Sequence, residues 1–152
     1  MTTKCEYCQK DGGYGDLIFE TDHWMVFLAP SQRYLGTCVV ALKRQSKNLS
    51  ELEEGEWMDF AGIVRKLEYA LDRSFKPTLY NWSCFKNATF RNQEPNPEIH
   101  WHFIPRYRDE IKFRGTVFED PDFGYIPQPV ERKVPKNIME SIMAVIKQNL
   151  QF

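Results

Sequence analysis

Residues 98–107 read EIHWHFIPRY, a stretch that holds two of the three histidines in a chain of 152 residues. Polar and apolar side chains alternate along it, which is typical of a β-strand with one apolar face. Because side chains of a strand point alternately to its two faces, Glu98, His100 and His102 share one face of a strand over 98–104. The apolar residues between them point the other way. The stretch therefore predicts an anchored strand that presents two imidazoles.

The rest of the chain predicts further strands around this one. Segments 16–20 and 23–29 are rich in β-forming residues and flank the polar pair Thr21-Asp22, which is the pattern of a hairpin. The β-branched apolar run at 37–43 predicts a buried strand. Two further segments, at 78–85 and around 111–118, also have strand character.

Two segments show the apolar spacing of amphipathic helices. From Ser50 to Pro77, apolar residues recur every three or four positions and are interpreted as core: Trp57, Phe60, Val64, Leu67 and Leu71. Ser50 and Glu53 resemble a capping box, and one helix, or a short helix and then a long one, fits this segment. A terminal helix is expected at 137–150. Strands with one central and one terminal helix predict an α+β fold, an antiparallel sheet covered by helices.

The composition is that of a folded globular protein, with 42% hydrophobic and 27% charged residues, and we expect a single domain over 1–152. The longest apolar runs, at 24–29 and 38–42, are too short to cross a bilayer. The amino terminus has no apolar export signal, so a cytoplasmic location is expected. Twenty basic and twenty-one acidic residues give a net charge of −1, which argues against binding of nucleic acid by electrostatic wrapping.

The two histidines suggest chemistry at phosphorus. A neutral imidazole is a nucleophile near pH 7 because its reference pKa is about 6.5. A second imidazole two residues later can donate a hydrogen bond to the same phosphate or to the leaving oxygen. From the residues alone, two alternatives stay open: His100 and His102 are ordinary polar groups on a half-exposed sheet, or two ligands of a metal.

The run HWHFIPRY, together with GTCVVALKRQSKNLSEL at 36–52, resembles the histidine-triad (HIT) superfamily of nucleotide hydrolases and transferases, whose signature is His-φ-His-φ-His-φ-φ. FEDPDFG at 118–124 is similar to a branch of diadenosine polyphosphate hydrolases. The resemblance implies a HIT-like fold with about five antiparallel strands, one long central helix and a C-terminal helix. It also implies a nucleotide as substrate and a homodimer as the common assembly.

By this resemblance His100 takes the middle position of the signature, which belongs to the nucleophile. It would attack the α-phosphorus of a nucleotide and form a covalent nucleotidyl-imidazole that water hydrolyses. His102 takes the third position and would contact the phosphate or bridging oxygen; galactose-1-phosphate uridylyltransferase relatives carry glutamine there, so His102 is similar to the hydrolase side. Glu98 occupies the first position, where the signature has histidine.

The resemblance also implies residues that bind substrate. Asn81 matches the strand asparagine of the family, and Asn87 falls where relatives have a polar amide; both would donate N–H groups to phosphate. Gln32 stands where relatives have an acidic residue that holds the ribose, and Glu98 is a further candidate. Arg106 is expected to be a surface or dimer-contact residue rather than a phosphate clamp.

Cys5 and Cys8 have the spacing of a zinc knuckle, which supplies two of the four ligands that zinc needs. In zinc-bearing relatives two histidines complete the site, and the matching positions here are Gln45 and Glu98. No cofactor is required by the expected reaction. A structural zinc held by Cys5 and Cys8 with His23 or Glu98 is one alternative, and loss of the metal is the other.

Three rival functions stay open. The altered first position favours a non-catalytic nucleotide-binding or regulatory protein. A nucleotidyltransferase or phosphorylase would use the same intermediate with a different acceptor. A metal-binding module would use Cys5 and Cys8 with His100 and His102.

Overall fold

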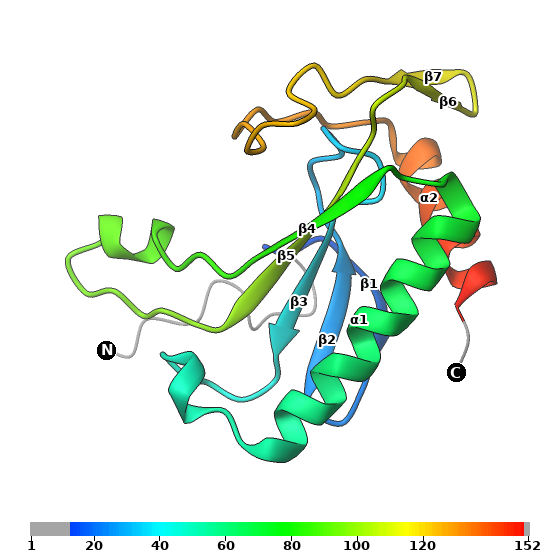
Figure 1. Cartoon of the computed structure of the whole chain (residues 1–152). Coiled ribbons are helices and arrows are strands. Elements are labelled where there is room, and N and C mark those ends of the chain that lie inside the picture. Colours follow the sequence, from blue (N-terminus) through cyan, green and yellow to red (C-terminus); the bar gives the residue numbers. More distant parts are fainter. Residues whose placement is uncertain (1–12, 151–152) are drawn as a thin grey trace.

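A five-stranded antiparallel sheet forms the centre of the molecule (Figure 1). The computed structural model describes residues 13–150. The strands are β1 (Asp16–Glu20), β2 (Trp24–Leu28), β3 (Cys38–Leu42), β4 (Leu79–Ser83) and β5 (His100–Arg106). Their spatial order is β1-β2-β3-β5-β4, so the histidine strand is paired on both sides. The predicted α+β fold and the predicted hairpin of the first two strands are confirmed.

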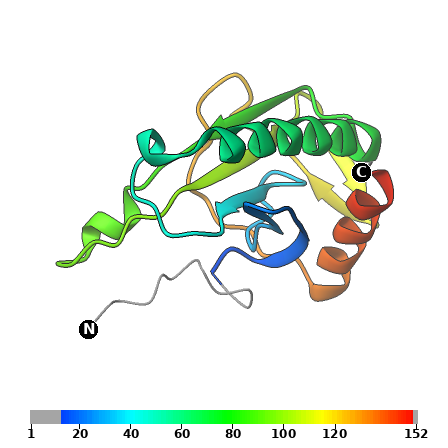
Figure 2. The same ribbon diagram turned by 90° about the horizontal axis from the view of Figure 1, so that it is seen from below.

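Two helices, α1 (Glu54–Phe75) and α2 (Lys136–Asn149), pack with the sheet around the main core (Figures 1 and 2). Every second residue of the central strands enters this core, among them Trp24, Val26 and Leu28 of β2. The helices contribute Leu67 and Ile142, which have no exposed surface. A smaller apolar cluster lies on the other face of the sheet and contains Tyr14, Met25, Phe27, Ala29, Val39 and Ala41. The sheet therefore has a helix face and a far face.

The start of α1 differs in detail from the expectation. A short 3-10 helix, η1 (Leu49–Glu51), comes first, so a short helix followed by a long one is confirmed. Because η1 takes up Ser50, the capping box forms one turn later, between Glu53 and Glu56. The helix ends at Phe75, where Lys76 adopts a left-handed conformation with φ of 51° before Pro77.

The buried stripe of α1 is rotated relative to the expected one. Ile63, Leu67 and Leu71 are buried, whereas the expected core residue Trp57 is 39% exposed. Phe60 lies between them, half-buried, and its ring packs on Trp101 with centroids 4.9 Å apart. The spacing of apolar residues allowed two overlapping stripes, and contact with the sheet selects the one that contains Ile63.

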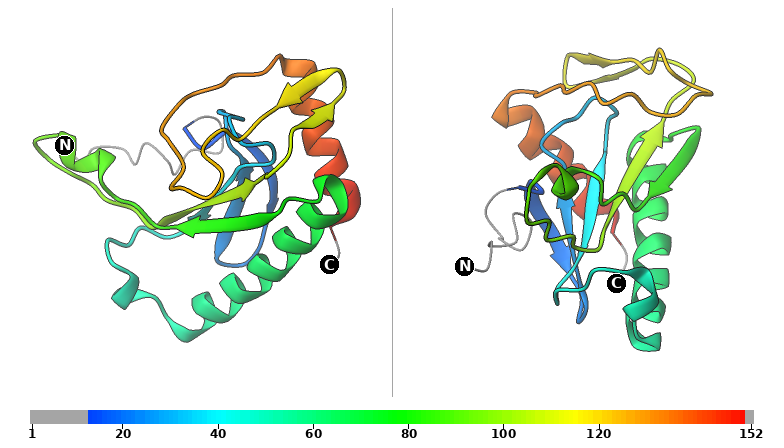
Figure 3. Two further views of the ribbon diagram at one scale, coloured as in Figure 1. Left: turned by 45° about the horizontal axis from the view of Figure 1, so that its top comes forward. Right: turned by 90° about the vertical axis from the view of Figure 1, so that its left-hand side faces the viewer.

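Three segments lie outside the main sheet: a second hairpin, the β4–β5 connection and the chain between β7 and α2. Residues expected to have strand content around 111–118 form a separate hairpin of β6 (Ile111–Phe113) and β7 (Thr116–Phe118), with positive φ at Arg114 and Gly115 in the turn. The β4–β5 connection contains η2 (Ala88–Arg91). After β7 the chain runs past the end of β5 before it enters α2 (Figure 3). No helix between residues 13 and 150 is long and apolar enough to cross a membrane.

Candidate functional site

His100 and His102 stand on the far face of the sheet, in a strand held on both sides. His100 lies opposite Ala41 of β3, and His102 lies opposite Val39 of β3 and Ser83 of β4. Phe103 points to the helix face and is fully buried there. The predicted alternation along this stretch is thus present in the structure, and the two imidazole rings lie edge to face with centroids 5.0 Å apart.

The ring of His100 has a defined orientation. Its Nδ1 lies 3.0 Å from the main-chain oxygen of Glu98. A carbonyl oxygen only accepts hydrogen bonds, so Nδ1 must carry the proton, and Nε2 carries the lone pair of the neutral ring. The side of the ring is packed near Tyr14, with centroids 5.3 Å apart, and only 8% of His100 is exposed. The fold therefore selects the tautomer whose Nε2 is the nucleophilic atom.

Both imidazoles are held in the neutral form. Burial lowers the pKa of His100 below its ordinary value, although the hydrogen bond to the Glu98 carbonyl and the negative charge of Glu98 oppose this. Burial and the neighbouring His100 lower the pKa of His102 to about 4. At neutral pH His100 consequently needs no base to expose its lone pair, and His102 retains one N–H to donate.

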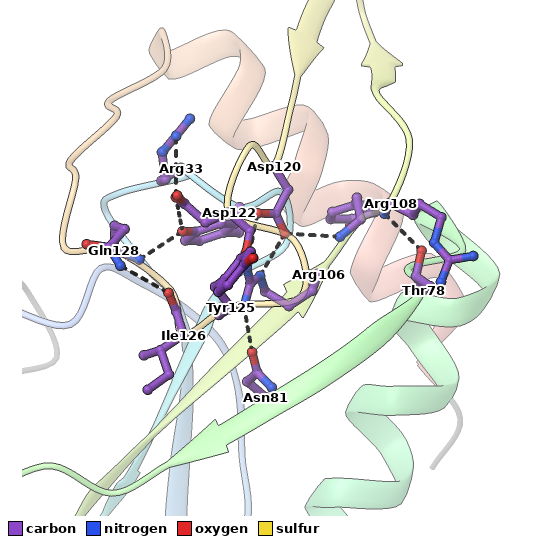
Figure 4. Close-up of polar contacts among 12 residues, drawn as sticks. Arg33, Thr78, Asn81, Arg106, Arg108, Asp120, Asp122, Tyr125, Ile126 and Gln128 are labelled. Carbon is purple, nitrogen blue, oxygen red and sulfur yellow. Dashed lines mark hydrogen bonds and ion pairs between the residues drawn. The ribbon is translucent and has the colours of Figure 1, made fainter.

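Asn81 shares the far face with the histidines. It lies opposite Ile104 on the neighbouring strand, and the two-residue alternation puts it diagonally between His102 and Arg106. The Nη1 of Arg106 donates to its Oδ1 over 2.9 Å (Figure 4). This hydrogen bond assigns the oxygen of the amide, so the other end of the Asn81 side chain is an N–H donor.

Arg106 is not the surface residue that the sequence suggested. It is 2% exposed, and its guanidinium forms a two-point ion pair with the buried carboxylate of Asp120, at 2.7 and 3.0 Å. A charge taken out of water is tolerated only when it is paired, and Asp120 supplies that pair. Arg106 thereby ties the segment after β7 to the end of the histidine strand (Figure 4).

Comparison of the sequence with models of known protein families identifies the family of this chain. The sequence model of the HIT domain matches residues 13–109, which contain all five strands of the sheet and both histidines. This chain belongs to the HIT domain family. Its first strand, its long helix and its histidine strand all lie inside the matched segment.

Solved structures share the HIT fold over nearly the whole chain. A histidine triad protein from Sinorhizobium meliloti superposes with a TM-score of 0.68 and 17% identity, covering 97% of this chain and 96% of that one. A HIT-like protein involved in cell-cycle regulation from Bartonella henselae gives a TM-score of 0.66 and 19% identity, covering 95% and 93%. At these identities the likeness shows the fold.

A curated relative is the galactose-1-phosphate uridylyltransferase of Thermotoga maritima. It is 23% identical over 144 residues, which make up 91% of this chain and 45% of that protein. The chain therefore spans less than half the length of the curated relative that it matches. By its name, this relative is a transferase of a uridylyl group.

Gln32 does not fit the substrate-binding role expected from the HIT resemblance. Its side chain has no exposed surface, and its amide is used inside the β2–β3 connection. Its Nε2 donates to the carbonyl oxygens of Ala29 and Thr37, at 2.9 and 3.0 Å, and its Oε1 accepts from the N–H of Gly36 at 2.8 Å. Every hydrogen of this amide is committed to the loop, so none is left for a ribose.

The other two predicted substrate-binding residues lie at different places relative to His100 and His102. Glu98 is buried two residues before the start of β5, and its main-chain oxygen contacts the ring of His100. Asn87 is exposed at the start of η2 on the β4–β5 connection, and no contact within residues 13–150 brings it to the histidines. Its phosphate-binding role stays a prediction.

The described part of the chain does not assemble a metal site. Within residues 13–150 no group of three or more His, Cys, Asp or Glu residues is close enough to hold a metal ion. The Nδ1 of His23 lies 3.1 Å from Asp59 instead, at the β1–β2 turn. Gln45, at one expected ligand position, donates to Asn96. Cys5 and Cys8 lie outside the described residues, so the zinc prediction is not tested.

Sequence reasoning missed Arg106 and Asp120 as parts of this site. Both stood inside motifs that had been noticed, the Pro-Arg pair after the histidines and FEDPDFG at 118–124. An unpaired basic residue on the polar face of a strand was the signal that could have prompted a search for an acidic partner.

Proposed function

We propose that this protein is a nucleotide hydrolase that cleaves a phosphoanhydride or phosphoramidate at the α-phosphorus through a covalent nucleotidyl-His100 intermediate. A diadenosine polyphosphate-like molecule is the proposed substrate. The observation that carries the proposal is the hydrogen bond from Nδ1 of His100 to the Glu98 carbonyl, together with the lowered pKa of the ring. It supplies a neutral imidazole with its lone pair on Nε2.

The proposed reaction has two steps at phosphorus. Nε2 of His100 donates its lone pair to the α-phosphorus, and the bond to the leaving group breaks with its electron pair on that group. Water then attacks the same phosphorus, the N–P bond returns its electrons to Nε2, and the proton of the water passes to solvent. His102 and the amide of Asn81 donate N–H groups to the phosphoryl oxygens, which is the main contribution a protein makes to phosphoryl transfer.

Glu98 has a proposed part in the first step. The imidazole ring becomes positively charged once Nε2 bonds to phosphorus, while Nδ1–H keeps its bond to the Glu98 carbonyl. The negative charge of Glu98 favours a positive ring on His100. A carboxylate at the first signature position is therefore compatible with catalysis, which weakens the case for a non-catalytic protein.

A nucleotidyltransferase is the second candidate, and it is favoured by the similarity to a uridylyltransferase. The two functions share the His100 intermediate and differ in whether water or a phosphorylated acceptor takes the nucleotidyl group. Against it stands histidine at position 102, which by resemblance belongs to the hydrolase side.

The proposed assembly is a homodimer, and β4, the last strand of the sheet order, offers an edge for it.

The proposal is tested with wild type, His100→Ala and His23→Ala. His23 lies at the β1–β2 turn and pairs with Asp59 of α1, whereas His100 and His102 stand on the far face of the sheet. Its replacement is therefore a matched loss of one histidine outside the site. The three proteins are incubated with dinucleoside polyphosphates and nucleoside phosphoramidates, with and without chelator. We expect turnover by wild type and His23→Ala only, unaffected by chelator, and a nucleotidyl adduct detected by intact mass after alkaline quenching.

Each other result selects another function. Equal turnover by His100→Ala contradicts the mechanism, and nucleotide binding without turnover supports a regulatory protein. Product formation that depends on an added phosphate or sugar phosphate supports the transferase. Loss of nucleotide binding with chelator supports the metal module.

A further inference from the structure

We infer that Arg106 is a positioning residue, which acts on the substrate through Asn81 by fixing the amide of Asn81 with its N–H donors turned toward the phosphate. The inference rests on the proposed function and adds the residue that sets the donor geometry of the site. Arg106 itself does not touch substrate.

The hydrogen bonds of Arg106 account for every donor of its guanidinium. Nε and Nη2 bind the two oxygens of Asp120, Nη2 also donates to the carbonyl of Asp122, and Nη1 donates to the carbonyl of Tyr125, over distances of 2.7 to 3.0 Å. The fifth donor goes to Oδ1 of Asn81 at 2.9 Å. A guanidinium has five N–H groups, so Arg106 has none left for a phosphate.

The geometry of this group is rigid, which is what positioning requires. The guanidinium carbon lies 4.9 Å from the centre of the Tyr34 ring, so the plane is supported by stacking as well as by hydrogen bonds. Asp120 neutralises the charge inside the protein. Arg106 therefore offers Asn81 a hydrogen-bond donor in a fixed direction, and its positive charge is already balanced by Asp120.

The hydrogen bond from Arg106 determines which end of the Asn81 amide faces the histidines. It lies on the far face diagonally between Arg106 and His102. With Oδ1 turned to Arg106, Nδ2 is turned away from it, and the hydrogen bond that the Asn81 side chain makes within residues 13–150 is the one to Arg106. An amide without the Arg106 bond is able to rotate and present oxygen to an anionic phosphate, which repels it. Holding the donor in place removes that cost before substrate arrives.

The first test is a double-mutant cycle on the affinity for a nucleoside monophosphate, a product of the proposed reaction. Arg106→Lys keeps a positive charge for Asp120 and loses the planar fork that reaches Asn81. We expect it to weaken binding about tenfold in the wild-type background and by less than about twofold beside Asn81→Ala, since the lost donor is then already absent. Equal losses in both backgrounds overturn the inference.

A second variant separates positioning from support of the fold. Asn81→Asp keeps an oxygen for Arg106 but replaces the N–H donors by a carboxylate oxygen. We expect the nucleotide affinity to fall about tenfold or more while the melting temperature does not fall. Asp59→Asn, which weakens the bonds from Thr21 and His23 at the opposite end of the sheet, is the matched control and should lower the melting temperature with unchanged affinity. Unchanged affinity in Asn81→Asp overturns the inference.

A third readout needs neither turnover nor nucleotide binding, and so distinguishes failure of this inference from failure of the proposed function. In wild type the side-chain N–H signals of Asn81 should appear in ¹⁵N spectra as one ordered pair, and in Arg106→Lys they should shift and broaden. Unaltered signals in Arg106→Lys overturn the inference even for an active enzyme.

Discussion

The imidazole rings of His100 and His102 stand 5.0 Å apart at neighbouring same-face positions of β5. Burial disfavours a charge on either ring, and a charge on His100 further disfavours one on His102, whose pKa is lowered to about 4. The structure consequently keeps an uncharged pair at neutral pH, and this has consequences for both activity and stability.

The activity should tolerate mild acid. Because the pKa of His100 is lowered, kcat/KM should not begin to fall at the ordinary histidine pKa of about 6.5 but at lower pH. The check is a pH profile of kcat/KM for a dinucleoside polyphosphate. An acid limb centred at or above 6.5 would contradict a lowered pKa of the nucleophile.

The stability should depend on pH through His102. Its pKa is about 6.5 in the unfolded chain and about 4 in the folded one, so between these values the unfolded state binds more protons. The free energy of unfolding should therefore be at its full value above pH 6.5 and decline as the pH falls toward 4, by up to about 3 kcal/mol from this residue. Urea unfolding at several pH values, compared with His102→Asn, measures it; equal slopes for both proteins would exclude His102 as the cause.

Glu98→Gln should slow formation of the covalent intermediate. The glutamine keeps the carbonyl that orients His100 but removes a negative charge that favours the positive ring. We expect the single-turnover rate of adduct formation to drop by roughly threefold to tenfold, an effect typical of losing one partly screened charge contact. Glu131→Gln, an exposed carboxylate between β7 and α2, is the control. A faster reaction in Glu98→Gln would mean that the carboxylate opposes the nucleophile.

Gln32→Ala should destabilise the protein without changing its affinity for nucleotide. The side chain makes three hydrogen bonds inside the β2–β3 connection, and its loss leaves buried main-chain groups without partners. The expected decrease in the free energy of unfolding is about 1–3 kcal/mol. Denaturant unfolding and a nucleotide titration together provide the check, and a raised dissociation constant at full stability would restore the substrate-binding role.

Leu67→Ala should cost more stability than Trp57→Ala. Leu67 is fully buried under the sheet, and removal of such a side chain typically lowers the free energy of unfolding by about 2–5 kcal/mol. Trp57 is 39% exposed, so much of its ring already contacts water. Chemical denaturation of the two variants decides the order, and the reverse order would contradict the exposed position of Trp57 on α1.

The strands and their faces could be predicted because their causes are local. The alternation at 98–104 assigned His100 and His102 to one face, and the β-branched run at 37–43 marked a buried strand. The orientation of α1 was less predictable, since Trp57 and Ile63 both belong to acceptable apolar stripes. Only packing on the sheet distinguishes them.

The roles of the polar residues could not be predicted in the same way. Gln32 and Asn81 both carry a side-chain amide, yet the amide of Gln32 bonds only within its own loop, whereas that of Asn81 is oriented by an arginine of the neighbouring strand. A hydrogen-bonding group has the same chemistry in either setting. Its burial and partners decide what it does.

By itself, the sequence determined the apolar periodicities. These periodicities decide which segments are helices and which are strands, and which face of the strand carries His100 and His102. Tertiary structure alone decided that Arg106 meets Asp120, fourteen positions further along the sequence. The physical reason is range: periodicity acts between neighbours along the chain, whereas pairing of a buried charge depends on which distant segment excludes water from it.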